Sequence, residues 1–263
     1  MALAKISTEK KGNSMSLNFR DRLRKRDLLI GIILTLPAPE LAEICADAGF
    51  DWLFLDMEHG QLDLKDVQRM CQAVGHRCPC LVRIPANEEA WIKRALDIGV
   101  SGLIVPQVKT AEETARAVAP SKYPPEGQRS VGITRAHRYG TQFQEYVNTA
   151  NQETAIVIQV EHIDSVRNVD RIIEVPGCDA IFIGPYDLSA SLGKTGQIGD
   201  PEVQQAIARV KSACAAKNFP AGIFVRDFKM ARSAAEEGYS LLAVGMDITL
   251  FSAAARQVVD SFG

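Results

Sequence analysis

Polar side chains that could perform acid–base chemistry follow several apolar runs of this 263-residue chain. They are Asp56, Glu58 and His59 after one run, Arg83 after the next, Gln159 and Glu161 after a third, and Asp187 after a fourth. Carboxylates bind hard cations through oxygen, an imidazole exchanges protons near neutral pH, and a guanidinium holds an oxyanion with two parallel donors. The set indicates chemistry on a small anionic substrate.

Glu161 and Asp187 follow two apolar runs that we expect to be neighbouring strands. Adjacent strands lie about 4.8 Å apart, so two carboxylates at their ends repel each other unless a cation sits between them. Oxygen ligands favour Mg²⁺ or Mn²⁺ over zinc. The pair therefore predicts a metal site; the alternative is one carboxyl group that is protonated or paired with an arginine.

Gln159 and Arg83 are the predicted contacts for a bound anion. Gln159 precedes Glu161 by two residues, so both point to the same side of a strand. Its amide would contact an oxyanion or, alternatively, bond to neighbouring backbone. Arg83 would bind a carboxylate, form a salt bridge to Asp56 or Glu58, or do both.

His59 is the predicted general acid or base, because it follows a strand-end Asp-x-Glu sequence. His162 follows Glu161 directly and should point to the other side, which predicts a structural role. No lysine stands at the end of a central strand, which argues against an aldolase that forms an imine.

The elements that position these residues alternate in type. Apolar runs predict eight strands, with helical patterns between them and glycines at helix ends. Eight such units predict a single-domain α/β fold, a (β/α)₈ TIM barrel, whose active site lies at the carboxyl ends of the strands. A doubly wound sheet is the alternative, but the chain lacks GxGxxG. The predicted strands are 29–35, 51–56, 80–84, 101–105, 155–161, 179–184, 220–224 and 240–245.

Two segments do not follow this alternation of strands and helices. Residues 1–14 predict a disordered extension before a barrel domain at 15–263. Residues 120–152 predict a structured loop over the substrate pocket or, alternatively, a solvated connection with a helix at 141–150.

Composition excludes several classes of protein. The net charge of −2 provides no basic surface for nucleic acid, and the longest apolar run, 28–39, is too short to span a membrane. The polar N-terminus lacks a secretory signal, and six cysteines without a CxxC pair predict reduced thiols. We expect a cytoplasmic protein.

Seven motifs in order resemble the HpcH/HpaI aldolases, over about residues 28–251. They are GFDWLFLDMEHG, LVRIP, ALDIGVSGLIVPQV, YPPEGQRSVG, IVIQVE, IFIGPYDLSASLG and AVGMDITLF. The resemblance implies a class II pyruvate aldolase that cleaves 4-hydroxy-2-oxo acids to pyruvate and an aldehyde, as in aromatic catabolism. It implies a divalent metal ion (Mg²⁺, Mn²⁺ or Co²⁺).

The resemblance also implies roles for individual residues. Glu161 and Asp187 would hold the metal, Arg83 would stabilise the enolate, and Gln159 would orient pyruvate. His59 would deprotonate the 4-hydroxyl group through a water. Asp97 would pair with the catalytic histidine of a neighbouring subunit in a homo-oligomer, commonly a hexamer built from dimers.

Two positions depart from the family pattern. Ile33 stands where a tryptophan is common, and Tyr186 stands where a small residue precedes the metal aspartate, which leaves the aldehyde open. Decarboxylation of a 2-oxo acid or other enolate chemistry on the same site is the alternative reaction. A barrel that only binds a small acid is the alternative from another class.

Overall fold

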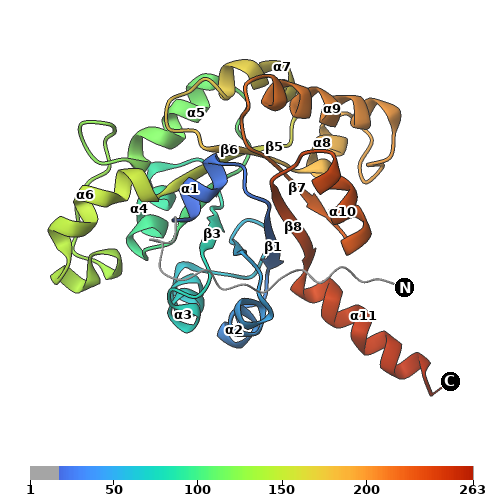
Figure 1. Cartoon of the computed structure of the whole chain (residues 1–263), viewed down its shortest axis with the longest axis horizontal. Coiled ribbons are helices and arrows are strands. Elements are labelled where there is room, and N and C mark those ends of the chain that lie inside the picture. Colours follow the sequence, from blue (N-terminus) through green and yellow to red (C-terminus); the bar gives the residue numbers. More distant parts are fainter. Residues whose placement is uncertain (1–17, 263) are drawn as a thin grey trace.

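Eight parallel strands form a closed barrel in the computed structural model, which describes residues 18–262 (Figure 1). The predicted TIM barrel is confirmed, and the alternative of an open doubly wound sheet is excluded. The predicted extension at 1–14 lies outside the described residues. The strands are β1 (Leu29–Leu34), β2 (Trp52–Asp56), β3 (Cys80–Arg83), β4 (Gly102–Val105), β5 (Ala155–Val160), β6 (Ala180–Ile183), β7 (Ala221–Val225) and β8 (Leu241–Met246).

Helices follow the strands and surround the barrel (Figure 1). The segment 120–152 contains a helix near the predicted place, after two short 3₁₀ turns at Ala119–Ser121 and Arg135–Gly140. The expectation that this segment covers the substrate pocket is wrong, because Arg135 and Lys122 donate to the carbonyl oxygens of Ile98 and Thr154 at the amino-terminal face of the barrel. The α-helices are α1 (Phe19–Arg24), α2 (Pro39–Ala48), α3 (Leu64–Val74), α4 (Glu89–Asp97), α5 (Ala111–Val118), α6 (Phe143–Glu153), α7 (Ile163–Ile172), α8 (Pro185–Ser191), α9 (Pro201–Ala216), α10 (Phe228–Glu236) and α11 (Asp247–Asp260).

The inside of the barrel is filled by large aromatic side chains. Trp52 and Phe54 alternate along β2 and pack against Phe182 of β6, with ring centroids 6.3 and 5.7 Å from it. Trp52 lies across the backbone of Gly31, where a Cβ atom would come within 2.4 Å of the indole. The interior is therefore a packed core and not a channel, and it forms the floor beneath the strand ends.

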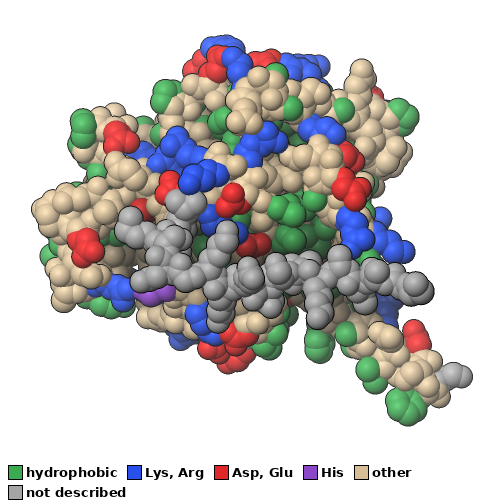
Figure 2. All heavy atoms as spheres, viewed as in Figure 1, with side chains coloured by type: hydrophobic (Ala, Val, Ile, Leu, Met, Phe, Trp, Pro, Cys, Tyr) green, Lys and Arg blue, Asp and Glu red, His purple; other side chains and the backbone are tan. Residues whose placement is uncertain are grey.

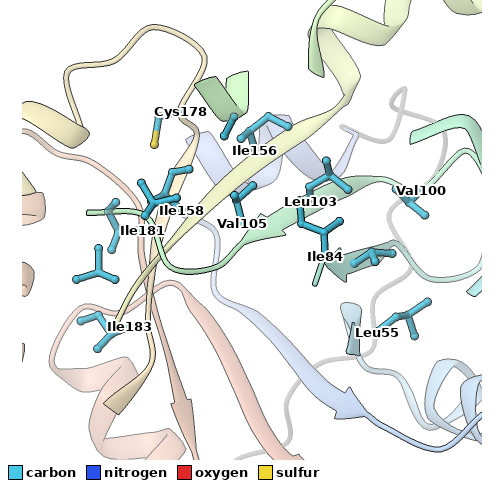
Figure 3. Packing of buried hydrophobic residues seen from close by; sticks show 14 of the residues in the cluster. Leu55, Ile84, Val100, Leu103, Val105, Ile156, Ile158, Cys178, Ile181 and Ile183 are labelled. Atoms are coloured by element: carbon cyan, nitrogen blue, oxygen red, sulfur yellow. The ribbon is translucent and has the colours of Figure 1, made fainter. Parts of the chain in front are cut away.

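Aliphatic side chains fill the layer between the strands and the helices. Figure 3 shows part of this layer, where Leu103 and Val105 of β4 lie near Ile156 and Ile158 of β5. These positions alternate with the inward-facing ones, as the two-residue period of a strand requires. Both faces of these strands are buried, which explains why they read as continuous apolar runs.

Helix α1 closes the amino-terminal end of the barrel. Its Phe19 and Leu23 join the interior cluster around Trp52, and Arg20 donates to Asp179 and to the carbonyl oxygen of Asn151 at the starts of neighbouring units. The opposite end, where the strands finish, is left for the polar residues. None of the helices in residues 18–262 is long and apolar enough to cross a membrane.

Candidate active site

The strand register brings the predicted polar residues together at the carboxyl end of the barrel. Asp56 of β2 is the register partner of Arg83 of β3, and Val160 of β5 is paired with Ile183 of β6. Glu161 therefore follows its strand directly beside Gly184. Like Trp52 and Phe54, these polar residues occupy inward-facing positions of their strands, so they lie directly above the aromatic core. The guanidinium of Arg83 lies 5.2 Å from the ring centre of Phe54.

Arg83 is held by the buried carboxylate of Asp56. Its Nε donates to Oδ1 at 2.8 Å and its Nη2 donates to Oδ2 at 2.6 Å. The same Oδ1 accepts from the backbone N–H groups of Glu58 and His59, so Asp56 also fixes the turn after β2. The predicted salt bridge exists, and only a long contact of 3.5 Å joins Nη1 of Arg83 to Gln159. Nη1 is the donor that remains available for a substrate anion.

The negative charge of Glu58 is only partly balanced by hydrogen bonds and by the nearby guanidinium. Its Oε2 lies 3.3 Å from Nε of Arg83, but that N–H already donates to Asp56, and Oε2 accepts no hydrogen bond from any residue in 18–262. Burial, and after it repulsion from Glu161, Asp56 and Asp187, raises the pKa of Glu58 to about 7 although Arg83 opposes this. The site thus carries more negative charge than its arginine offsets.

Glu161 is buried and fixed from two sides. The backbone N–H of Gln107 donates to its Oε1 at 2.7 Å, and the side-chain amide of Gln159 donates to its Oε2. Burial is the main reason that the pKa of Glu161 is raised, and repulsion from Asp187 adds to it. A Cβ atom at Gly184 would lie 3.2 Å from Oε2 of Glu161, so the glycine leaves open the space beside this oxygen.

Asp187 lies in the first turn of α8 and is half-buried. Residues 18–262 contain no cluster of three or more His, Cys, Asp or Glu side chains that could hold a metal ion. Glu161 and Asp187 are the two carboxylates at this end of the barrel that could hold a metal ion, as the sequence predicts. They suit Mg²⁺ or Mn²⁺, since such ions keep several waters or substrate oxygens beside one or two carboxylates. The unpartnered oxygen of Glu58 and the excess of carboxylates over cations fit a positive ion at this place.

His59 stands at the edge of the site. Its side chain is 60% exposed, and its Nε2 lies 3.9 Å from Oε2 of Glu58. It is free to meet a substrate that enters from solvent. His162 instead caps the amino terminus of α7 and accepts from the backbone N–H of Asp164 through Nδ1, which is a structural contact.

Tyr186 borders the site from the start of α8. Its side chain is half-exposed, and its ring centroid lies 6.2 Å from that of Phe224 on β7. Tyr186 thus forms an aromatic wall next to Asp187. Ile33, the other departure from the family pattern, is buried inside the barrel among the interior cluster.

Asp97 is not part of this cluster within one chain. It is the last residue of α4, at the amino-terminal face of the barrel, and its Oδ1 accepts from Nη2 of Arg129 at 3.0 Å. Arg129 is buried and also donates to the hydroxyl of Tyr146. The predicted salt-bridge alternative for Asp97 is therefore present, and its side chain remains 28% exposed.

Sequence reasoning missed two contributors to the site. Gln107 acts through its backbone N–H with a φ of 56°, a left-handed conformation that its residue type does not indicate. Gly184 acts through its missing side chain. The predicted neighbouring strands β5 and β6 do lie side by side, but the residue type of Gly184 gave no sign that it leaves space beside Glu161.

Comparisons with known proteins agree with this geometry. The family model described as HpcH/HpaI aldolase/citrate lyase matches residues 29–254. A hydroxypyruvate/pyruvate aldolase of Cupriavidus necator is 39% identical over 93% of this chain and 91% of its own length. A 5-keto-4-deoxy-D-glucarate aldolase of an Enterobacter species is 38% identical over 93% and 96% of the two chains. A solved family protein of Burkholderia cenocepacia superposes with a TM-score of 0.89, at 38% identity over 92% and 98% of the chains.

Proposed function

Because the chain belongs to the HpcH/HpaI aldolase/citrate lyase family, whose members are carbon–carbon lyases, we propose that it is a metal-dependent pyruvate aldolase. It cleaves 4-hydroxy-2-oxo acids to pyruvate and an aldehyde, and the reverse addition uses the same site. The observation that carries the proposal is one guanidinium, Arg83, among the four carboxylates of Asp56, Glu58, Glu161 and Asp187. Two relatives with aldolase names, on pyruvate and on a keto-deoxy sugar acid, support the substrate class.

A divalent ion held by Glu161 and Asp187 would act as a Lewis acid toward the carboxylate and keto oxygens of the 2-oxo acid. Arg83 stabilises the charge that develops on the enolate oxygen, through the Nη1 donor that Asp56 leaves available. Asp56 keeps the guanidinium in place and therefore lowers the reorganisation that the reaction requires. Gln159, fixed between Arg83 and Glu161, orients the pyruvate half.

His59 removes the proton of the 4-hydroxyl group during cleavage, directly or through one water. Its exposed position at the mouth suits the half of the substrate that departs as the aldehyde. Tyr186 and Phe224 form the wall beside that half. We propose that this wall, and not the pyruvate-binding residues, selects the aldehyde.

Metal removal tests the proposal. Chelated protein should lose pyruvate release from 4-hydroxy-2-oxoheptanedioate or 5-keto-4-deoxy-D-glucarate, and Mg²⁺, Mn²⁺ or Co²⁺ should restore it. Borohydride with pyruvate should trap no adduct, because none of the inward-facing residues at the strand ends is a lysine. Glu161→Gln should lose Mn²⁺ binding in calorimetry, whereas the exposed Glu236→Gln should keep it. Full activity in excess chelator, or a covalent pyruvyl adduct, would refute the proposal.

Decarboxylation of oxaloacetate is the second candidate, because it needs only stabilisation of the enolate by Arg83 and the metal. The exposed position of His59, apart from the Arg83–Glu161 cluster, allows the two reactions to be separated by mutation.

We also propose that the protein works as a homo-oligomer, a hexamer built from dimers, in which Asp97 acts on His59 of a neighbouring subunit.

A further inference from the structure

The motif YPPEGQRSVG, residues 123–132, contributes none of the residues at the carboxyl end of its own barrel. It forms a closed loop in which the backbone N–H of Arg129 donates to the carbonyl oxygen of Lys122 at 2.8 Å. Gly127 is required in this loop, because a Cβ atom would come within 2.4 Å of the same carbonyl oxygen. The loop lies beside helix α6, at the left of Figure 1, and Figure 2 shows few charged side chains over this helix. The side chain of Arg129 is fully buried there.

Two tyrosine rings hold the guanidinium of Arg129. Its central carbon lies 4.6 Å from the ring centre of Tyr123 and 5.5 Å from that of Tyr146, and Nη1 donates to the hydroxyl of Tyr146 at 3.1 Å. His137 fixes both rings, since its Nε2 lies 3.1 Å from the hydroxyl of Tyr123 and its own ring packs edge-on against Tyr146. These contacts set the orientation of the guanidinium.

Asp97 is the only carboxylate that pairs with Arg129 in residues 18–262. Nη2 of Arg129 donates to Oδ1 of Asp97 at 3.0 Å, whereas its Nε finds no acceptor in the described part of the chain. Oδ2 of Asp97 accepts no hydrogen bond from these residues either, and the side chain is 28% exposed. One oxygen of the carboxylate is therefore fixed, and the other remains available to a group outside the chain.

The stability of the fold does not explain this ion pair. Asp97 is the last residue of α4, where the negative end of the helix dipole disfavours a carboxylate. Burying Arg129 removes its charge from water, and apolar side chains of similar volume generally hold a segment as well as a buried ion pair does. A carboxylate with one fixed and one free oxygen instead suits a role in orienting a further group.

We propose that Arg129 is a positioning residue, which holds Asp97 in the orientation in which Oδ2 meets His59 of a neighbouring subunit. This proposal rests on the role of Asp97 in the proposed function. A carboxylate beside an imidazole orients the ring and stabilises its charged form, so its placement affects proton transfer and not the enolate. Arg129 acts only through Asp97. Its loss should therefore lower aldol cleavage and spare the decarboxylation of oxaloacetate.

Steady-state kinetics of Arg129→Met test the proposal. The variant should lower kcat of aldol cleavage about 10–100-fold, as misplacement of a catalytic group does, with KM and oxaloacetate decarboxylation little changed. If Arg129→Met does not fold, Arg129→Lys takes its place with the same expectation, because lysine lacks the planar pair of donors. Arg20→Met is the matched control. It removes another buried arginine at the same face, paired with Asp179, and should leave the ratio of the two reactions unchanged.

Subunit mixing separates positioning from a structural defect. Arg129→Met chains mixed with inactive His59→Ala chains should regain activity above either parent, because a mixed pair contains one site with an intact His59 and an Asp97 that Arg129 holds. Arg129→Met chains mixed with Asp97→Asn chains should regain nothing, since both changes damage the same half of the shared site.

Equal loss of both reactions in Arg129→Met would show that Arg129 only supports the fold, and it would overturn the proposal. Mixed oligomers with His59→Ala that form in native mass spectrometry and regain no activity would overturn it too. Full aldol cleavage in Arg129→Met beside an impaired Asp97→Asn would overturn this proposal and leave the role of Asp97 intact. Full aldol cleavage in Asp97→Asn would overturn both, and a wild-type chain without aldol cleavage would refute the proposed function as well.

Discussion

Replacing Glu58 by glutamine should stabilise the metal-free protein, and the gain should depend on pH. The folded-state pKa of Glu58 is about 7, against an ordinary value of 4.5. A carboxyl group whose pKa is raised on folding binds more protons in the folded state, so its ionisation costs stability as pH rises between those two values. Glutamine has nearly the same shape and carries no charge, so it removes this cost.

The magnitude follows from the two pKa values. At pH 8 the folded protein must ionise a group that prefers to be neutral, which costs about 3 kcal/mol, whereas at pH 5 the cost is about 1 kcal/mol. For a chain of this size the difference corresponds to a melting temperature about 6–12 °C higher at pH 8 and less than about 4 °C higher at pH 5. These values are upper limits, because water that enters the site reduces the penalty.

Urea denaturation of chelated protein at pH 5, 6, 7 and 8 measures the effect. Glu236→Gln, at an exposed carboxylate, is the control and should show no such trend. Added Mg²⁺ should reduce the advantage of Glu58→Gln, since a cation near Glu161 lowers the cost of ionising Glu58. A gain that is equal at all pH values, or a loss of stability at pH 8, would contradict the reasoning.

Two further predictions concern the proton path. The His59→Ala variant should lose aldol cleavage by about 10²–10⁴-fold and keep much of its oxaloacetate decarboxylation, whereas Arg83→Ala should damage both reactions. Coupled assays for pyruvate measure both activities. Intact aldol cleavage in His59→Ala would show that His59 is not the general base. If Asp97 acts on His59 of a neighbouring subunit, inactive His59→Ala chains and weakened Asp97→Ala chains should regain activity above either parent when their subunits exchange. If mixed oligomers form but regain no activity, Asp97 does not act on His59 of a neighbouring subunit, and its role is the ion pair with Arg129.

The sequence alone predicted the barrel and most of the polar residues at the carboxyl ends of its strands. Continuous apolar runs with a helical pattern after each indicate parallel strands that are buried on both faces, and the number of eight such units favoured a barrel over a doubly wound sheet. The two-residue alternation then placed Gln159 and Glu161 on one side and His162 on the other, because that alternation is a local property of the backbone. The proximity of Glu161 to Asp187 followed once β5 and β6 were taken as neighbours.

Only the tertiary structure decided how the charges are distributed. The pKa of Glu58 depends on burial and on Arg83, Glu161 and Asp187, which reach it from other parts of the chain, so no local pattern encodes it. The bond from Gln107 to Glu161 arises from a left-handed backbone turn, and the pairing of Asp97 with Arg129 joins residues 32 positions apart. The start of the last helix makes the same point, because Asp247 accepts from the backbone N–H groups of Thr35 and Leu36 after β1, and these bonds form only once β1 and β8 are neighbours.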